Sequence, residues 1–487
     1  MSASNKLGKG MKFLSVILGA LLMGFLWRAR GTHGFGSFWG VAIVGSVFTL
    51  LIFAVYGNRS KMKFELMPMG ALLCGITVPA WGCVISMPGS VIRSVVPFSG
   101  EAEETFSSVG GGRGTVMMLL LGFSLLCVYS VYIGTLFSRR EYKFWHYAVF
   151  CAVFLAAGAI AKATFSHSLM NLLAPEVTDG FKKGLADIGF EGGARQAYLE
   201  HMGSMSWGKK VPFGRYYFEC VEHISFAFSA LVLILTALIA FRDKITACVA
   251  LLINLVCAVS ITLADYFQIC NYKTGFISSL NVPSYLRITS WSLWEFTTGF
   301  LMGFGIMLII ALLPNELTAG KKYRSEPFIN NKALRYVINL LLITFAYVLL
   351  PVRALCMRVF RTLEDRQILS DIDLIEIVCI AVITAAVFVV LAVKLKKNIL
   401  DKNLPVPFKM KPCDFAAKAL LWFSIYYIVL YFFTLEASIP TFIYRIVKSP
   451  SNVVDMTGIE YFYVYLIDAL LFEIIYIPSK RRLSSRR

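Results

Sequence analysis

The sequence predicts an all-α, polytopic membrane protein, and three observations lead to this fold class. Hydrophobic residues make up 57% of the 487 residues and charged residues 16%, whereas soluble domains average about 25% charged. The mean hydropathy is +0.69. Apolar runs of the length that crosses a bilayer as a helix, about 20 residues, recur from one end of the chain to the other.

Twelve apolar runs qualify as membrane spans, so we predict a bundle of about twelve helices. The first follows Lys6, Lys9 and Lys12 and is not followed by a signal-peptide cleavage site, so we expect it to be retained. The eighth opens with Trp291 and Trp294, residues that favour the membrane interface. The predicted spans are 11–28, 38–56, 66–86, 115–137, 145–163, 222–241, 245–265, 291–314, 334–351, 374–393, 415–435 and 459–477.

The basic residues set the predicted orientation. If the N-terminus is cytoplasmic, every loop on the inner side is rich in Lys and Arg, which is the rule for short cytoplasmic loops. Both termini are therefore predicted to be cytoplasmic, in a multi-pass protein of the plasma membrane. The net charge of +18 is interpreted as this topology signal together with attraction to anionic membrane lipids, and not as a nucleic-acid-binding surface.

We predict a single integral membrane domain, residues 1–487, with one long extracytoplasmic excursion at about 164–221. No linker rich in Pro, Gly or Ser divides the chain. Within the excursion, residues 180–201 combine charged and apolar residues with the spacing of a short amphipathic helix, broken near Gly192 and Gly193.

Two glycine-rich stretches near predicted helix starts are the candidate substrate site. One contains Arg28, Arg30 and His33, and the other is Val109–Thr115, which contains Arg113; both include the triplet Arg-Gly-Thr. Backbone N–H groups at a helix start, the helix dipole and a guanidinium together suit a phosphate or carboxylate. The alternative is that the glycines form turns or close helix contacts and that the arginines reach the lipid headgroups.

Carboxylates within the spans are candidates for ion coupling. Asp468 lies near the middle of the last predicted span, and Asp265 and Glu295 lie near the outer ends of the seventh and eighth. An intramembrane carboxylate is costly unless it is paired or protonated, so each is a functional hypothesis with a structural ion pair as its alternative. We expect Glu295 to pair with Arg28 or Arg30 and to complete the substrate site.

No motif indicates a cofactor or a metal. The sequence has no Walker A motif, dinucleotide fingerprint or Gly-x-Ser-x-Gly motif, and its histidines match no zinc spacing. We therefore predict no cofactor, no metal and no nucleic-acid partner. The expected partners are membrane lipids and either an anionic small molecule or a phosphate-linked lipid.

Three functions are compatible with this pattern. The first is an ion-coupled secondary transporter of an anionic solute, in which Arg28, Arg30 and Arg113 bind the anion. The second is a membrane-embedded transferase with an extracytoplasmic site, acting on a phosphate-linked lipid or glycan, with His33, His223 or Glu222 as general base. The third is a membrane scaffold, and whether the protein is an enzyme stays open.

Overall fold

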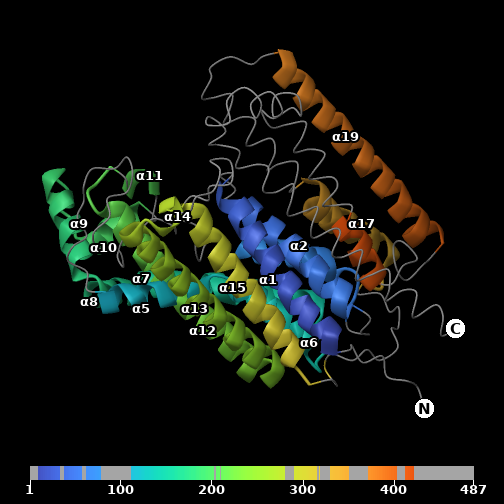
Figure 1. Ribbon diagram of the computed structural model, residues 1–487, viewed down its shortest axis with the longest axis horizontal. Coiled ribbons are helices and arrows are strands. Elements are labelled where there is room, and N and C mark those ends of the chain that lie inside the picture. Colours follow the sequence, from blue (N-terminus) through green and yellow to red (C-terminus); the bar gives the residue numbers. More distant parts are fainter. Residues whose placement is uncertain are drawn as a thin grey trace. The chain divides into compact units, whose positions relative to one another are not determined.

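The computed structural model is helical throughout the residues it describes, with no strand among them, which confirms the all-α class for that part of the chain (Figure 1). The described residues are 9–32, 38–57, 62–77, 111–201, 205–208, 210–279, 290–314, 317, 329–349, 371–402 and 412–421.

Six of the described helices are long and apolar enough to cross a membrane, and a seventh span results if one bent helix pair is counted. These helices are typical of a multi-pass membrane protein. The count of twelve spans and the cytoplasmic position of both termini stay predictions. The six spans are Gly10–Arg28, Phe144–Ala163, Gly214–Ala240, Lys244–Gln268, Leu293–Leu312 and Lys332–Leu349.

The chain divides into two compact units. Unit 1 comprises Met1–Gly75 and Gly275–Arg487, and unit 2 comprises Ile76–Thr274. The helices described in unit 1 are α1 (Lys9–Thr32), α2 (Phe38–Tyr56), α3 (Leu66–Ile76, which ends at the boundary), α14 (Phe276–Ser279), α15 (Ser290–Leu312), α17 (Lys332–Thr344) with the π-helical turn η4 (Phe345–Leu349), and α19 (Asp371–Lys396) with the π-helical turn η5 (Lys397–Asp401).

In unit 1, α1 and α15 form a close antiparallel pair. Glycines make the close approach possible: a Cβ added to Gly303 would overlap the carbonyl oxygen of Gly19, and a Cβ on Gly24 would lie 2.9 Å from the Phe296 ring. Small residues that let backbones approach are the usual basis of tight helix pairs in membranes. The seam also fixes which residues of the two helices lie at the same level.

Unit 2 carries the predicted excursion. Its helices are α5 (Gly111–Ser124), α6 (Cys127–Phe137), α7 (Phe144–Ala163), α8 (Ser166–Leu173), α9 (Pro175–Asp187), α10 (Ala194–Glu200), α11 (Met205–Gly208), α12 (Gly214–Leu235) with the π-helical turn η2 (Thr236–Ala240), and α13 (Lys244–Thr274).

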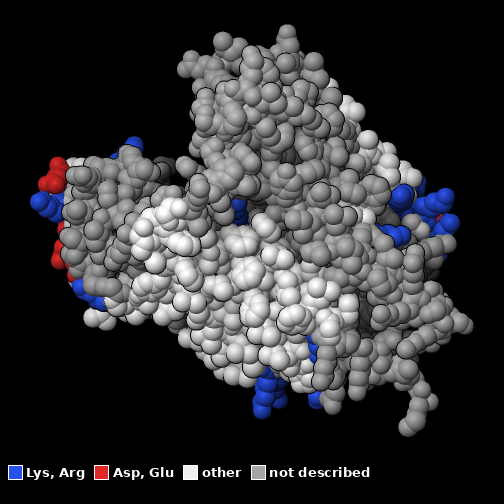
Figure 2. All heavy atoms as spheres, viewed as in Figure 1, with Lys and Arg blue, Asp and Glu red and all other residues white. Residues whose placement is uncertain are grey.

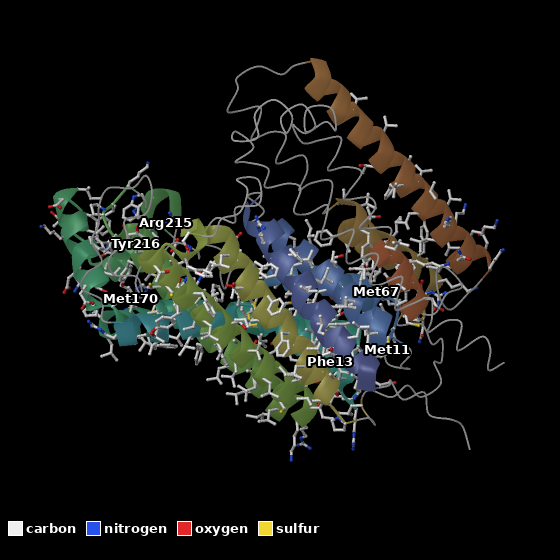
Figure 3. All side chains as sticks on the ribbon, viewed as in Figure 1. Met11, Phe13, Met67, Met170, Arg215 and Tyr216 are labelled. Carbon is white, nitrogen blue, oxygen red and sulfur yellow. The ribbon has the colours of Figure 1, made fainter. Side chains whose placement is uncertain are left out.

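The excursion folds into a small helical cap, α8 to α11, packed on the first half of α12. Its apolar core includes Met170 of α8, Phe181 of α9, and Tyr216 and Tyr217 of α12; Met170 and Tyr216 are labelled in Figure 3. The predicted helix break is confirmed, since α9 ends at Asp187 and α10 begins at Ala194, with the intervening turn at positive φ. Helix α12 begins at Gly214, within the stretch predicted as the excursion, whose boundaries stay a prediction.

The predicted fourth span, 115–137, is bent in its middle. Helix α5 ends at Ser124 and α6 begins at Cys127, and their axes differ by 49°. No side chain caps the start of α6. The break therefore places a helix end inside the apolar part of unit 2, which is the kind of interruption that polar sites in membrane proteins use.

Charge in unit 2 lies at the two ends of its long helices. Figure 2 shows red and blue atoms around the cap and blue atoms at the opposite ends of α12 and α13, with uncharged flanks between them. Those flanks expose large apolar side chains, among them Leu231, Leu235, Leu251, Leu255 and Val259. This distribution suits helices whose sides face lipid.

Candidate functional site

Arg28 and Glu295 are both buried at the same level of the α1–α15 seam. Each side chain is only 5% exposed. The seam is antiparallel and brings Gly24 against Phe296; Arg28 is one turn beyond Gly24, and Glu295 directly precedes Phe296. A guanidinium and a carboxylate thus lie buried at one depth of unit 1. The pairing of Glu295 with Arg28 or Arg30 stays a prediction.

The glycine-rich stretch around Arg28 does not open a helix. Helix α1 continues through Thr32, so Arg28 and Arg30 lie in its last turns, and α2 begins at Phe38. The expectation of a helix start at Arg30-Gly31-Thr32 is therefore wrong. An arginine at a helix C-terminus complements the negative end of the dipole, so any anion bound there would depend on the guanidinium and not on backbone N–H groups. The side chain of Arg30, and all of His33, lie outside the described residues.

Arg113 does lie at a helix start, because α5 begins at Gly111. Its guanidinium forms an ion pair with Glu176 in the first turn of α9, and the two side chains are 39% and 26% exposed. An intramolecular carboxylate thus occupies the position that was predicted for a substrate anion. A substrate would have to compete with Glu176 for Arg113.

Of the two predicted coupling carboxylates, the structure describes one. Asp265 is fully buried within the α13 span. It shares that helix with the buried Gln268 and Asn271, so the C-terminal part of α13 carries a polar stripe. Asp468 lies outside the described residues.

Glu222, a candidate general base, is engaged on both oxygens. Lys162 Nζ of α7 lies 2.5 Å from Oε2, and the Tyr198 hydroxyl of α10 donates to Oε1 at 2.5 Å. The ammonium group of Lys162 also lies 4.4 Å from the centre of the Phe226 ring. This cluster joins the cap to two spans, and its pairing favours a structural role.

His167 is buried under the cap beside this cluster. Its Nδ1 lies 2.8 Å from the Tyr217 hydroxyl, whereas its Nε2 has no hydrogen-bond partner among the described residues. Burial, together with the charge of Arg195, lowers the pKa of His167 to about 4. The ring is therefore neutral at physiological pH. On α12, Arg215 (Figure 3) pairs through Nε with the buried Glu219, one helical turn further along, at 2.9 Å.

Asn254 was not among the predicted site residues. It lies in the middle of the α13 span, is fully buried, and neither its amide nitrogen nor its amide oxygen has a hydrogen-bond partner among the described residues. The signal was an isolated amide side chain within the long apolar run 245–265. A buried amide without partners is unfavourable inside a membrane span, so the residue needs an explanation.

No protein-family model, curated protein or solved structure matches this chain.

Proposed function

We propose that the protein is an ion-coupled secondary transporter of an anionic solute in the plasma membrane. The observation that carries this proposal is the buried Arg28 at the same level as the buried Glu295 in the α1–α15 seam. Arg28 is buried at the end of the α1 span, and burying a charge is costly unless it is paired, so a buried arginine needs an anionic partner. The guanidinium binds carboxylate or phosphate with two parallel hydrogen bonds.

In this proposal Glu295 balances the charge of Arg28 when the site is empty. A substrate carboxylate or phosphate then takes over the guanidinium, and Glu295 is free to accept a proton or a cation. Arg30, His33 and Arg113 remain proposed contacts of the substrate, and Asp265 and Asp468 remain proposed coupling residues. The bent span α5–α6 supports the same function, because secondary transporters place binding sites at interrupted helices.

Uptake into proteoliposomes tests the proposal. The purified full chain is reconstituted, and entry of labelled phosphate and of labelled mono- and dicarboxylates is measured under an imposed pH or Na⁺ gradient. We expect Arg28→Ala to abolish uptake and Arg28→Lys to reduce it at least about tenfold, since lysine cannot form the two-pronged contact.

Arg335→Lys is the matched control, because Arg335 is an equally buried arginine, 4% exposed, in another span of unit 1. It should leave uptake near the wild-type rate. If no anion enters under either gradient, or if Arg28→Lys and Arg335→Lys behave alike, the proposal is wrong.

The alternative is a transferase acting on a phosphate-linked lipid or glycan. It would use His33, His223 or Glu222 as base, and Glu222 is already bound by Lys162 and Tyr198. That alternative would be favoured if Arg28→Ala or Arg30→Ala cells showed an altered lipid or glycan profile while the wild-type protein gave no flux.

A further inference from the structure

The seam between α13 and the bent pair α5–α6 has a fixed register. A Cβ added to Gly122 would lie 2.5 Å from Ala258 Cα, and a Cβ added to Gly134 would lie 2.9 Å from Thr246 Cα. The two glycines are twelve residues apart, and so are Thr246 and Ala258. The helices are therefore antiparallel and pair residue for residue at four-residue intervals along one face.

This register places Asn254 opposite Leu126, at the break between α5 and α6. The next pair along the seam is Ser130 with Ala250. Asn254 is fully buried and neither of its amide atoms has a hydrogen-bond partner among the described residues. By this register its side chain lies at the level where the facing helix is interrupted.

Ser130 and Asn254 bring two side-chain acceptors near the break. The Ser130 hydroxyl donates its proton to the Cys127 carbonyl at 2.8 Å, which leaves its oxygen able to accept. The Asn254 amide oxygen has no hydrogen-bond partner among the described residues. Neutral oxygens beside a helix end are the ligands that transporters offer to Na⁺.

Along α13 no carboxylate lies near Asn254. Asp243, which precedes α13, and Asp265 within it are each eleven residues from Asn254, or about 16 Å along a helix with a rise of about 1.5 Å per residue. Divalent cations require charged oxygen ligands, and no group of three His, Cys, Asp or Glu side chains that could hold a metal occurs among the described residues. On α13 there is therefore no carboxylate at this level for a proton to occupy.

We propose that Asn254, Ser130 and the α5–α6 break bind a monovalent cation, Na⁺, and that this is the ion whose gradient drives transport. The inference rests on the proposed transporter function for its coupling role. It assigns a binding site to unit 2 that is separate from the Arg28 site of unit 1.

Thermal unfolding of the purified full chain in detergent tests the binding step without any flux. The unfolding temperature is measured against NaCl, with choline chloride holding the ionic strength constant. Na⁺ should raise it in the wild type with a saturable dependence. Asn254→Ala should remove the Na⁺-specific rise, Ser130→Ala should weaken half-saturation at least about threefold, and Asn254→Asp, which adds a carboxylate, should strengthen it at least about tenfold.

Asn339→Ala is the matched control, because Asn339 is a fully buried asparagine in a unit 1 span whose amide nitrogen already donates to Arg335 O at 2.8 Å. It should keep the Na⁺ response. Asn254→Asp keeps the side-chain shape, so it provides the answer if Asn254→Ala does not fold.

Equal responses to Na⁺ and choline, or a full Na⁺ response in Asn254→Ala, would overturn the proposal. A response that follows the anion when chloride is replaced by gluconate, and that Asn254→Asp abolishes, would overturn it in favour of an anion site. The two proposals fail separately in proteoliposomes. Flux that depends on Arg28 but not on Na⁺ or Asn254 removes only the cation site, and Na⁺ binding without any anion flux removes only the transport function.

Discussion

The ion pair between Lys162 and Glu222 provides the sharpest test of how the cap is held to the spans. The perturbation is Glu222→Gln. The glutamine carbonyl can still accept the Tyr198 hydroxyl, so that hydrogen bond is kept. The side-chain amide, however, offers no charge to Lys162, whose remaining described contact is the Phe226 ring.

The expected cost follows from the exposure of the pair. The Lys162 and Glu222 side chains are 23% and 15% exposed. Breaking a buried pair costs about 3–5 kcal/mol, and an exposed pair contributes about 0–1 kcal/mol. We therefore expect Glu222→Gln to lower the free energy of unfolding by about 2 kcal/mol. Lys162→Met should cost a similar amount, and the double variant should cost at least about 1 kcal/mol less than the two single effects added together.

The assay is reversible unfolding in mixed micelles, followed by tryptophan fluorescence. Asp179→Asn is the matched control, because Asp179 pairs with Lys182 at 3.3 Å on the cap surface and the two side chains are 72% and 50% exposed. It should change the unfolding free energy by less than about 0.5 kcal/mol. If Glu222→Gln has no larger effect than the control, or if the Lys162 and Glu222 effects simply add, the pair does not hold the cap.

Three further predictions concern stability. Burial lowers the pKa of His167 to about 4, against an ordinary value of about 6.5, so the unfolded chain takes up a proton first as the pH falls. The free energy of unfolding should therefore drop by about 3 kcal/mol between pH 6.5 and pH 4. In unfolding titrations at a series of pH values, His167→Phe should reduce that dependence. Gly303→Ala should destabilise the protein strongly, because the added methyl would overlap the Gly19 carbonyl. Gly10→Ala, whose added methyl would meet no atom within 4 Å, should be neutral or stabilising by up to about 1 kcal/mol. Equal unfolding temperatures for the two variants would contradict the close α1–α15 contact. Asp243→Ala should lower the free energy of unfolding by about 3–5 kcal/mol, because both a lost helix cap and buried hydroxyls without an acceptor are destabilising. The carboxylate caps α13 by accepting hydrogen bonds from two backbone N–H groups at 3.1 Å, and it accepts three more from side-chain hydroxyls. A loss below about 1 kcal/mol would show that this cluster does not stabilise the fold.

Asp243 also gives a direction for acid sensitivity. Burial by itself would raise the pKa of this carboxyl, but hydrogen bonds from Ser138, Thr246, Tyr142 and the Thr246 backbone outweigh burial and hold the pKa below its ordinary value. A carboxylate with a lowered pKa stabilises the fold above the ordinary value, and that contribution is lost as the pH falls through the pKa of the folded state. The loop between α6 and α7 should therefore loosen at acidic pH.

Span positions could be predicted well where apolar composition decides them. The predicted runs 38–56 and 145–163 correspond closely to α2 (Phe38–Tyr56) and α7 (Phe144–Ala163), because about twenty apolar residues in a row are a local property of the chain. The predicted span 222–241 begins eight residues after the start of α12 at Gly214. Glu219 fell in the predicted excursion, whereas the structure places it on α12, where Glu219 and His223 are completely buried.

For the candidate site, too, some features follow from the sequence and others only from the tertiary structure. The sequence alone determined that this chain is apolar enough for a multi-pass membrane protein and that Arg28, Glu295 and Asp265 are costly residues to bury. Only the tertiary structure decided that Arg113 pairs with Glu176, that Arg28 lies at the end of α1 and not at the start of the next helix, and that Asn254 is fully buried on a helix packed along α5 and α6. The first and last of these depend on the register between helices that are distant in sequence. That register is set by where glycines allow two backbones to meet, which no periodicity within a single helix can show.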